Sequence, residues 1–402
     1  MKRLAVVLTV LTLLIFSVCC DADRKDVSSA LNTSVPSSTA TNLPGKEMRG
    51  VWISYSELQS AFDGDFRANM DKMLDNIAAL GLNAVFFHVR PFCDAFYRSD
   101  IFPWSKHITG TEGKAPSLDP LEYAVNAAHE RGIDLHAWIN PYRVSYSIND
   151  ADRLSDGSPV KKHMAAHPNS GFAVPYGNGL YLNPASEDAT QLIVDGVKEI
   201  IQNYDVDGIH FDDYFYPTTD ASFDRADYTA YCAAKSEPMS LDDWRRDNVN
   251  RMLSRVHAAV KEHDEKMPFG VSPAGNMQLN YDELYADTEA WVESGCVDYL
   301  IPQLYFGYTF PNEKYKFENL IYDWSKYRKK VNVIAGLAAY KIGNAEGEEK
   351  AEWESGCVLE KQIKYARGYK FGGFVFFSYS SLFSEDETNT NERSRISNLI
   401  GE

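Results

Sequence analysis

The sequence has little positive charge and lacks the loops that bind nucleotides. Its 40 Lys and Arg residues are outnumbered by 57 Asp and Glu residues, which gives a formal net charge of -17. A surface with this balance repels phosphate backbones, so we expect no nucleic acid partner. The sequence also contains no glycine-rich dinucleotide turn, no phosphate-binding loop with Lys and no Gly-x-Ser-x-Gly elbow. These absences argue against nucleotide-dependent enzymes and against serine hydrolases with a nucleophile elbow.

Cysteine is scarce, and its six residues are not spaced as metal ligands. Two of them lie together near the N-terminus, and the other four are far apart in the chain. We expect these four to be small core residues, with a disulfide among them as the alternative in an exported protein. The four are Cys93, Cys232, Cys296 and Cys357.

The apolar run at residues 4–18 is too short to span a membrane. It follows a basic start and leads into Cys19 and Cys20, an order that resembles a bacterial lipoprotein signal. We therefore expect residues 1–20 to be a signal peptide and Cys20 to carry a lipid anchor. The anchored protein would lie in the bacterial cell envelope. Cleavage near Ala22, giving a secreted protein, is the alternative.

The remaining sequence divides into a linker, one large domain and a short tail. Residues 21–46 are rich in Ser and Thr and have no hydrophobic periodicity, which is typical of a flexible linker. We expect one domain at residues 47–385 and a C-terminal tail at residues 386–402. Aromatic residues make up 13% of the chain, and their rings suit sugar surfaces as well as protein cores.

From residue 48 on, short runs of β-branched and aromatic residues alternate with longer helical patterns. Eight such units in about 340 residues predict a single (β/α)8 TIM barrel. An open doubly wound sheet is the alternative, but it usually brings a dinucleotide turn. Residues 144–186 follow the third strand and are predicted to be an insertion at the active-site end. The expected strands are residues 50–55, 83–90, 134–141, 208–214, 269–274, 299–306, 331–340 and 373–380.

Side-chain alternation along the strands predicts which residues face the barrel interior. In the fourth strand the apolar Ile209 and Phe211 should face the helices. His210, Asp212 and Tyr214 then point inward. The same alternation in the second, third and sixth strands turns further polar residues inward: His88, Arg90, His136, Asn140, Gln303 and Tyr305.

We expect Arg90, Asp212 and either Gln303 or Tyr305 to share one layer near the mouth of the barrel. Burying such a set of polar groups is costly, so its position at the strand ends favours a functional site. A structural ion pair between Arg90 and Asp212 is the alternative.

Several motifs follow one another in a specific order along the chain. They are Met-Arg-Gly-Val-Trp-Ile at 48–53, His-Val-Arg-Pro at 88–91, Asp-Ala-Phe-Tyr at 94–97, Pro-Trp at 103–104 with Thr-Gly at 109–110, His-Ala-Trp-Ile-Asn-Pro-Tyr-Arg at 136–143, Asp-Gly-Ile-His-Phe-Asp-Asp-Tyr at 207–214 with Pro217, and Asp-Tyr at 298–299 before Gln-Leu-Tyr at 303–305. Together they resemble the glycosyl-hydrolase-like 10 family over about residues 48–381. The resemblance implies a TIM-barrel glycoside hydrolase that is often exported and lipidated. For some members it also implies cleavage of peptidoglycan strands that have lost their stem peptides.

Glycoside hydrolysis requires one carboxyl group to protonate the leaving oxygen and usually a second as nucleophile or base. We expect Asp212 to be the central carboxylate, because a neighbouring Arg90 would keep it ionised. Asp213 or Asp94 then supplies the second role. In the alternative interpretations Asp213 binds backbone amides, and Asp94 orders its loop or binds a sugar hydroxyl.

A metal-dependent carbohydrate deacetylase is a different hypothesis for the same strand ends. His88, His136 and His210 with Asp212 could hold a divalent cation. The favoured interpretation is that the three imidazoles are hydrogen-bonded lining residues, so neither a metal nor a cofactor is expected.

The sequence therefore predicts a glycoside hydrolase that acts on a cell-envelope or other polysaccharide. The alternatives are a glycan-binding pseudo-enzyme on the same barrel and the metal-dependent deacetylase. The oligomeric state and the linkage that is cut are left open. The residues expected to bind substrate are Arg90, His136, Asn140, Tyr142, Arg143, His210, Tyr214, Gln303 and Tyr305.

Overall fold

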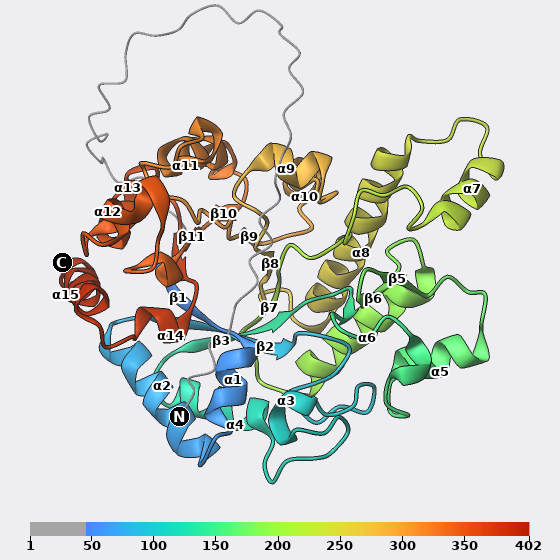
Figure 1. Ribbon diagram of the computed structural model, residues 1–402, viewed down its shortest axis with the longest axis horizontal. Coiled ribbons are helices and arrows are strands. Elements are labelled where there is room, and N and C mark those ends of the chain that lie inside the picture. The colour runs from blue at the N-terminus through green and yellow to red at the C-terminus, as the bar shows by residue number, and fades with distance from the viewer. Residues whose placement is uncertain (1–45, 402) are drawn as a thin grey trace, which may run out of the picture. The chain divides into compact units, whose positions relative to one another are not determined.

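The computed structural model describes residues 46–401, which form a parallel β-barrel surrounded by helices (Figure 1). The signal peptide, Cys20 and nearly all of the predicted linker lie outside the described residues. Within residues 46–401, no helix is both long and apolar enough to cross a membrane.

The sheet confirms the predicted barrel. Its strand order is β10-β9-β8-β7-β3-β2-β1-β12-β11. Only Ile334 separates β10 from β11, so the two are one interrupted strand that pairs with β9 on one side and with β12 on the other. This shared strand closes the ring. The strands are β1 (Met48–Ile53), β2 (Ala84–Arg90), β3 (Asp134–Ile139), β7 (Gly208–Phe211), β8 (Phe269–Val271), β9 (Tyr299–Leu300), β10 (Asn332–Val333), β11 (Ala335–Leu337) and β12 (Gly373–Phe376).

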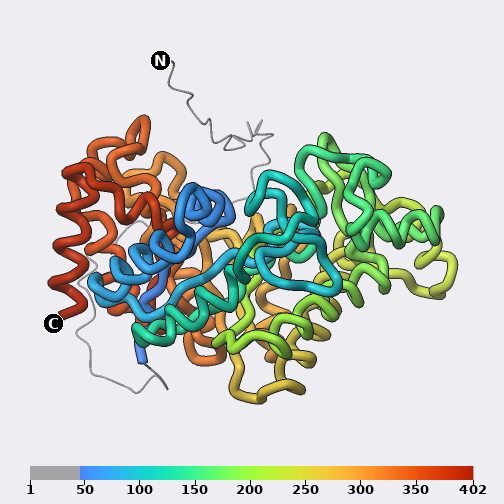
Figure 2. Tube along the Cα trace, turned by 90° about the horizontal axis from the view of Figure 1, so that it is seen from below, coloured from blue at the N-terminus to red at the C-terminus, as the bar shows by residue number. Residues whose placement is uncertain are grey.

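Helices connect the strands and cover the outside of the barrel (Figures 1 and 2). Several begin at a side-chain cap; Asp119, for example, accepts two backbone N–H bonds at the start of α4, where Pro120 fits the first helical position. The helices are α1 (Tyr55–Ala61), α2 (Phe66–Ala79), α3 (Lys106–Thr109), α4 (Pro120–His129), α5 (Pro159–Ala166), α6 (Glu187–Asn203), α7 (Arg225–Ala233), α8 (Leu241–His263), α9 (Met277–Asp282), α10 (Thr288–Ser294), α11 (Phe317–Trp324), α12 (Lys350–Trp353), α13 (Val358–Gly368), α14 (Tyr379–Leu382) and α15 (Glu387–Gly401).

The core has two parts. Large side chains such as Trp52, Phe86 and Tyr299 fill the barrel interior, and a second apolar layer lies between the strands and the helices. The four cysteines of the described residues are all free. Cys93 and Cys296 are buried as expected, whereas Cys232 and Cys357 are only half-buried, so the expectation of a core position is wrong for these two.

The predicted insertion after the third strand is confirmed as a small antiparallel sheet with α5. Its strands β4 (Arg143–Ser145), β6 (Gly179–Leu182) and β5 (Ala173–Tyr176) pair in that order. The sheet begins four residues after β3 ends, so it stands at the carboxyl end of the barrel strands.

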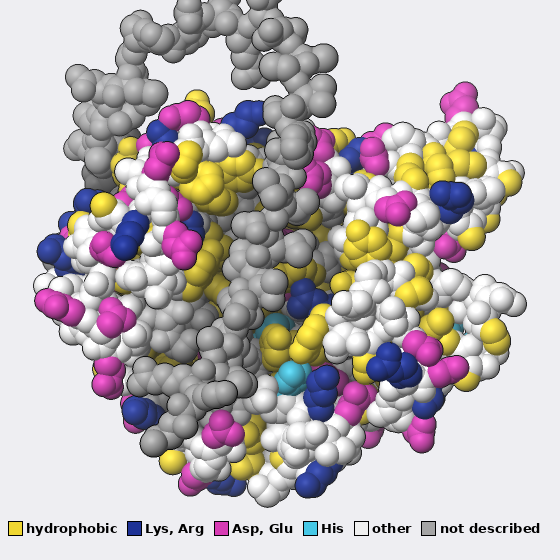
Figure 3. All heavy atoms as spheres, in the orientation of Figure 1, with side chains coloured by type: hydrophobic (Ala, Val, Ile, Leu, Met, Phe, Trp, Pro, Cys, Tyr) yellow, Lys and Arg dark blue, Asp and Glu magenta, His cyan; other side chains and the backbone are white. Residues whose placement is uncertain are grey.

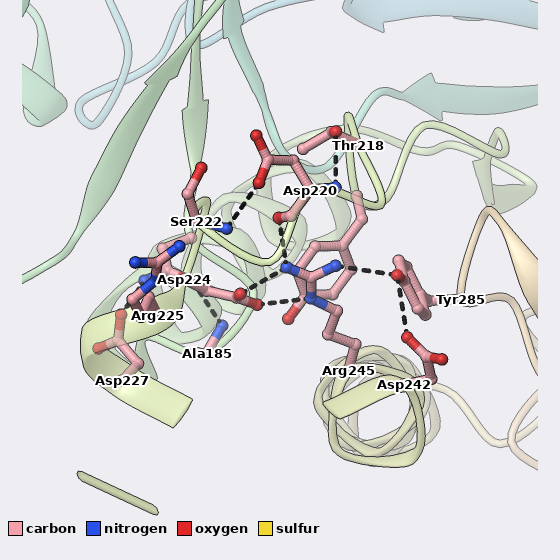
Figure 4. A network of polar contacts seen from close by, with 12 residues as sticks. Ala185, Thr218, Asp220, Ser222, Asp224, Arg225, Asp227, Asp242, Arg245 and Tyr285 are labelled. Atoms are coloured by element: carbon pink, nitrogen blue, oxygen red, sulfur yellow. Dashed lines mark hydrogen bonds and ion pairs between the residues drawn. The ribbon is translucent and has the colours of Figure 1, made fainter. Parts of the chain in front are cut away.

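A second insertion, which the sequence analysis did not anticipate, connects β7 to α8 and contains α7. A buried ion pair fixes it (Figure 4): the guanidinium of Arg245 on α8 binds both oxygens of Asp224, at 2.6 and 2.9 Å. The remaining Arg245 donors reach the Tyr285 hydroxyl and the carbonyl of Asp220. Because each of the three nitrogens of this buried group donates at least one hydrogen bond, the connection is held firmly against the barrel.

The C-terminal segment packs on the barrel through α15, the red helix in Figure 2. Ile396 and Leu399 are buried. The Glu392 carboxylate accepts the backbone N–H groups of Val358 and Glu360 at the start of α13. The segment that the sequence analysis set apart as a tail thus includes a helix that caps another helix.

One irregularity in β2 changes the orientation of a predicted site residue. His88 pairs with Trp138, but Arg90 pairs with Ile139, so the register shifts by one residue at Val89. A bulge of this kind reverses the inward and outward alternation beyond it. The prediction that Arg90 faces the interior beside Asp212 is therefore wrong.

The guanidinium of Arg90 lies instead between the sheet and α6. Its side chain is wholly buried and stacks on the ring of Phe102 at 3.9 Å. Gly196 on α6 leaves the necessary space, since a Cβ atom there would lie 2.1 Å from an Arg90 nitrogen.

We predict that Gly196→Ala destabilises the protein by about 1–3 kcal/mol, the usual range for overpacking a core. Helix propensity alone would favour Ala by about 1 kcal/mol, so a loss of stability reports the clash directly. Urea denaturation measures the change. Gly401→Ala is the control, because a Cβ at that helical glycine meets nothing within 4 Å. Equal or greater stability of Gly196→Ala would contradict this packing of Arg90.

Candidate active site

Imidazole and aromatic groups fill the barrel beneath its mouth. The Nε2 atom of His210 lies 3.1 Å from the Ser272 hydroxyl and 3.3 Å from the indole nitrogen of Trp52. The hydroxyl of Tyr299 lies 3.1 Å from His136 Nδ1 and 3.3 Å from His210 Nδ1. His136 and His210 are 2% and 0% exposed, so these two predicted substrate-binding residues lie below the surface that a substrate reaches.

His88 lies nearer the mouth and is also engaged by protein groups. Its ring stacks on Trp138 with 3.6 Å between centroids, and the backbone N–H of Tyr55 donates to its Nδ1 at 3.4 Å. Burial lowers the pKa of all three imidazoles. Across residues 46–401, no group of three or more His, Cys, Asp or Glu side chains is placed to hold a metal ion. The residues proposed as metal ligands therefore fit the lining role better.

Asp212 follows the last residue of β7 and is the most enclosed carboxyl group at the mouth, at 3% exposed. The indole nitrogen of Trp138 donates to its Oδ2 at 3.3 Å, and the backbone N–H of Tyr214 donates to its Oδ1 at 3.4 Å. Asn140, with its amide nitrogen turned toward Asp212, donates to the same Oδ2. Asn140 thus positions the carboxyl group and is itself only 1% exposed.

Arg143 provides the guanidinium that faces this carboxyl group. Its Nη1 donates to the Asn140 amide oxygen at 3.0 Å, and its guanidinium carbon lies 4.0 Å from the ring centroid of Tyr214. Burial raises the pKa values of both Asp212 and Asp213, and the positive charge of Arg143 opposes that rise. Arg143 starts β4 of the insertion, so the insertion supplies the positive charge that the sequence analysis assigned to Arg90.

The two adjacent carboxyl groups differ in proton affinity. Burial, and after it the charge of Asp213, raises the pKa of Asp212 to about 8. Burial also raises the pKa of Asp213 to about 6, while a hydrogen bond from Gln303 opposes the shift. The pair titrates together, and at pH 7 it holds one proton on the more enclosed Asp212. This state differs from the ionised Asp212 that the expected contact with Arg90 implied.

Aromatic side chains surround the mouth. The ring of Tyr305 lies 5.8 Å from those of Tyr340 and Phe377, and Phe377 also contacts Trp138 at 6.4 Å. Tyr214 is 53% exposed and carries Arg143 on its face. In Figure 3, histidine and basic side chains lie among hydrophobic ones over the region that β2 occupies in Figure 1. Flat surfaces beside charged groups suit the faces and hydroxyls of a sugar.

Two predicted residues lie apart from this cluster. Tyr142 is wholly buried with its ring against Phe215, so it does not reach a substrate. Asp94 lines a separate pocket beside the insertion. Burial raises the pKa of Asp94, and the groups that shift it further are Ser105, Glu112 and neighbouring basic residues.

The sequence analysis missed two contributors to the site. It did not count Trp138 among the site residues, although the strand alternation that turns His136 and Asn140 inward also turns Trp138 inward. It did not single out Phe377, which follows β12 directly, although the expected strand at residues 373–380 includes this residue.

We predict that Asp212→Asn stabilises the folded protein increasingly as pH rises. The folded-state pKa of about 8 exceeds the ordinary 3.8, so the folded wild type holds a proton that the unfolded chain has lost. This group therefore lowers stability as pH rises from about 4 to about 8, and Asn removes that effect. Thermal unfolding at a series of pH values should show a Tm difference that grows by a few degrees over this range. A difference independent of pH would contradict the shifted pKa.

Comparisons with known proteins agree with the geometry. The family model described as Glycosyl hydrolase-like 10 matches residues 47–355. The chain is 33% identical over 353 residues to glycosyl hydrolase YngK of Bacillus subtilis, covering 80% of this chain and 67% of that protein. It is 31% identical over 397 residues to glycosyl hydrolase DigH of Escherichia coli K12, covering 90% and 89%.

Solved structures share the fold at low identity. The glycoside hydrolase domain of PgaB (BpsB) from Bordetella bronchiseptica matches with a TM-score of 0.58 at 12% identity, covering 88% of this chain and 99% of that one. The endo-1,4-beta-mannanase of Rhizomucor miehei matches with a TM-score of 0.54 at 10% identity, covering 90% and 97%.

Proposed function

The chain belongs to the glycosyl hydrolase-like 10 family and is a glycoside hydrolase, and we propose that Asp212 and Asp213 carry out its chemistry. Asp212 is the general acid that protonates the leaving oxygen. Asp213 is the ionised partner, acting as nucleophile or as the base for water. Asn140, Trp138 and Arg143 hold and polarise the pair.

The division of proton affinity between the two carboxyl groups carries this proposal. A glycosidase needs one protonated and one ionised carboxyl group at the same pH. The pKa values of about 8 for Asp212 and about 6 for Asp213 give one protonated and one ionised carboxyl group near neutral pH. Gln303 and Arg143 favour the ionised form of Asp213, because both lower its pKa.

We propose a cell-envelope polysaccharide as the substrate class, with peptidoglycan strands lacking stem peptides as the specific substrate. The family resemblance suggests this glycan. The aromatic mouth with Tyr305 and Tyr214 supports a sugar ligand, and Arg143 offers a donor to sugar hydroxyls or to a carboxylate on the glycan. A lipid anchor at Cys20, placing the barrel in the cell envelope, belongs to the same proposal, and mass spectrometry of the mature N-terminus tests it.

Incubating the purified protein with peptide-free peptidoglycan strands and chitin oligomers, with products read by mass spectrometry, tests the proposed reaction. We predict cleavage by the wild type and a fall in kcat of about 100- to 10,000-fold for Asp212→Asn and Asp213→Asn. Asp205→Asn is a matched control, since its exposed carboxylate precedes the same strand at the opposite end.

The products separate the alternatives. Retained anomeric configuration would make Asp213 a nucleophile, and inversion would make it a base. Intact strands that still bind the wild type would identify a glycan-binding pseudo-enzyme. Full activity in Asp212→Asn would contradict the proposal.

We predict a bell-shaped pH dependence of kcat/KM with its maximum near pH 7. Activity requires Asp213 ionised, so it falls as pH drops below about 6, and it requires Asp212 protonated, so it falls as pH rises above about 8. Initial rates from pH 4 to 10 measure both limbs. Activity that keeps rising above pH 9 would exclude Asp212 as the acid.

A further inference from the structure

A pocket with an enclosed volume of about 30 Å³, room for a hydroxyl group or a water molecule, lies between the insertion and the loop after β2. Phe92, Asp94 and Lys106 line it from the loop side, and Ser145 and Tyr146 line it from the insertion. The pocket is separate from the Asp212 and Asp213 pair, and the proposed reaction leaves it without a role.

Asp94 is the residue in this pocket that most requires an explanation. It is only 5% exposed, and its Oδ1 atom has no hydrogen-bond partner. Burial raises the pKa of this carboxyl group to about 7, a hydrogen bond with Ser105 opposes the rise, and the nearby Glu112 adds to it. Leaving a buried hydrogen-bond acceptor unpaired costs folding free energy. A donor group on a bound ligand would remove that cost.

Tyr146 provides a flat surface at the entrance of the pocket. It is 52% exposed, and its ring lies 5.4 Å from that of Phe92. An exposed aromatic ring supported from behind by a buried one is a suitable platform for the apolar face of a pyranose.

A continuous series of contacts joins the pocket to the catalytic pair. Trp138, which donates to Asp212, stacks on His88 at 3.6 Å, and His88 contacts the ring of Tyr55 at 5.7 Å. Tyr55 in turn contacts Phe92 at 5.4 Å. On the open side, the guanidinium of Arg143 lies 4.0 Å from the Tyr214 ring and 6.0 Å from the Phe92 ring. Arg143, between the Tyr214 and Phe92 rings, therefore marks the path along which a glycan chain at the catalytic pair would reach the pocket.

We propose that the entrance of this pocket is a second sugar subsite, in which Tyr146 stacks on one sugar of the chain while a hydroxyl or amide N–H of that sugar enters the pocket and donates a hydrogen bond to Asp94. The subsite rests on the proposed function, since it names a polymeric glycan as the substrate. It gives Asp94 a role in binding and leaves the catalytic pair to Asp212 and Asp213. The insertion then selects long chains over short ones.

Binding measurements in the Asp212→Asn background test the subsite without cleavage of the ligand. The probes are chitohexaose and chitobiose, with affinities from isothermal titration calorimetry. We predict that the hexamer binds more tightly than the dimer. Adding Tyr146→Ala or Asp94→Ala, which removes the acceptor, should weaken hexamer binding by about tenfold, the size of a loss of one contact. Tyr146→Trp should retain the affinity.

Tyr322→Ala is the matched control, because Tyr322 on α11 is 65% exposed and outside both sites. Unchanged hexamer affinity in Tyr146→Ala and Asp94→Ala would overturn the subsite, as would a parent protein that does not bind the hexamer. Thermal unfolding confirms that each variant is folded. A wild type that binds the hexamer through these residues but cleaves no glycan would support the subsite and contradict the proposed function.

Discussion

The enclosure of Asp212 at the end of β7 is the constraint on which the site depends. Trp138 and Asn140 exclude water from this carboxyl group while each donates a hydrogen bond to it. Desolvation outweighs those bonds, so the pKa rises. The neighbouring Asp213 is half-buried and bonded to Gln303, and it remains the stronger acid. One strand end thus presents two carboxyl groups in different protonation states.

The insertion after β3 contributes two further residues to the site at the carboxyl end of the barrel. Arg143 faces the carboxyl pair and Tyr146 faces the neighbouring pocket, and only three positions separate them in the chain. The small antiparallel sheet fixes Arg143, which pairs with Tyr181 of β6, and Tyr146 directly follows the last residue of β4. The barrel supplies the acid and its partner, while the insertion contributes a positive charge and a surface for the chain.

Much of the fold followed from local pattern, and the site followed in part. The succession of strand and helix patterns predicted the barrel, and side-chain alternation correctly turned Asp212 and Asn140 toward its interior. The orientation of Arg90 did not follow, because the bulge at Val89 arises from pairing between β2 and β3 that no single strand reveals. The position of Arg143 depends on a hairpin within the insertion, and periodicity along the barrel strands contains no information about that hairpin.

The most direct measurement of the central claim is a ¹³C NMR titration of the Asp side-chain carboxyl carbons, with Asp212→Asn and Asp213→Asn used to assign the two signals. The account predicts that Asp212 titrates near pH 8 and Asp213 near pH 6. Loss of Asp213 should also lower the pKa of Asp212, since its charge contributes to the rise. Two carboxyl groups that both titrate near pH 4, or the reverse order, would contradict the account.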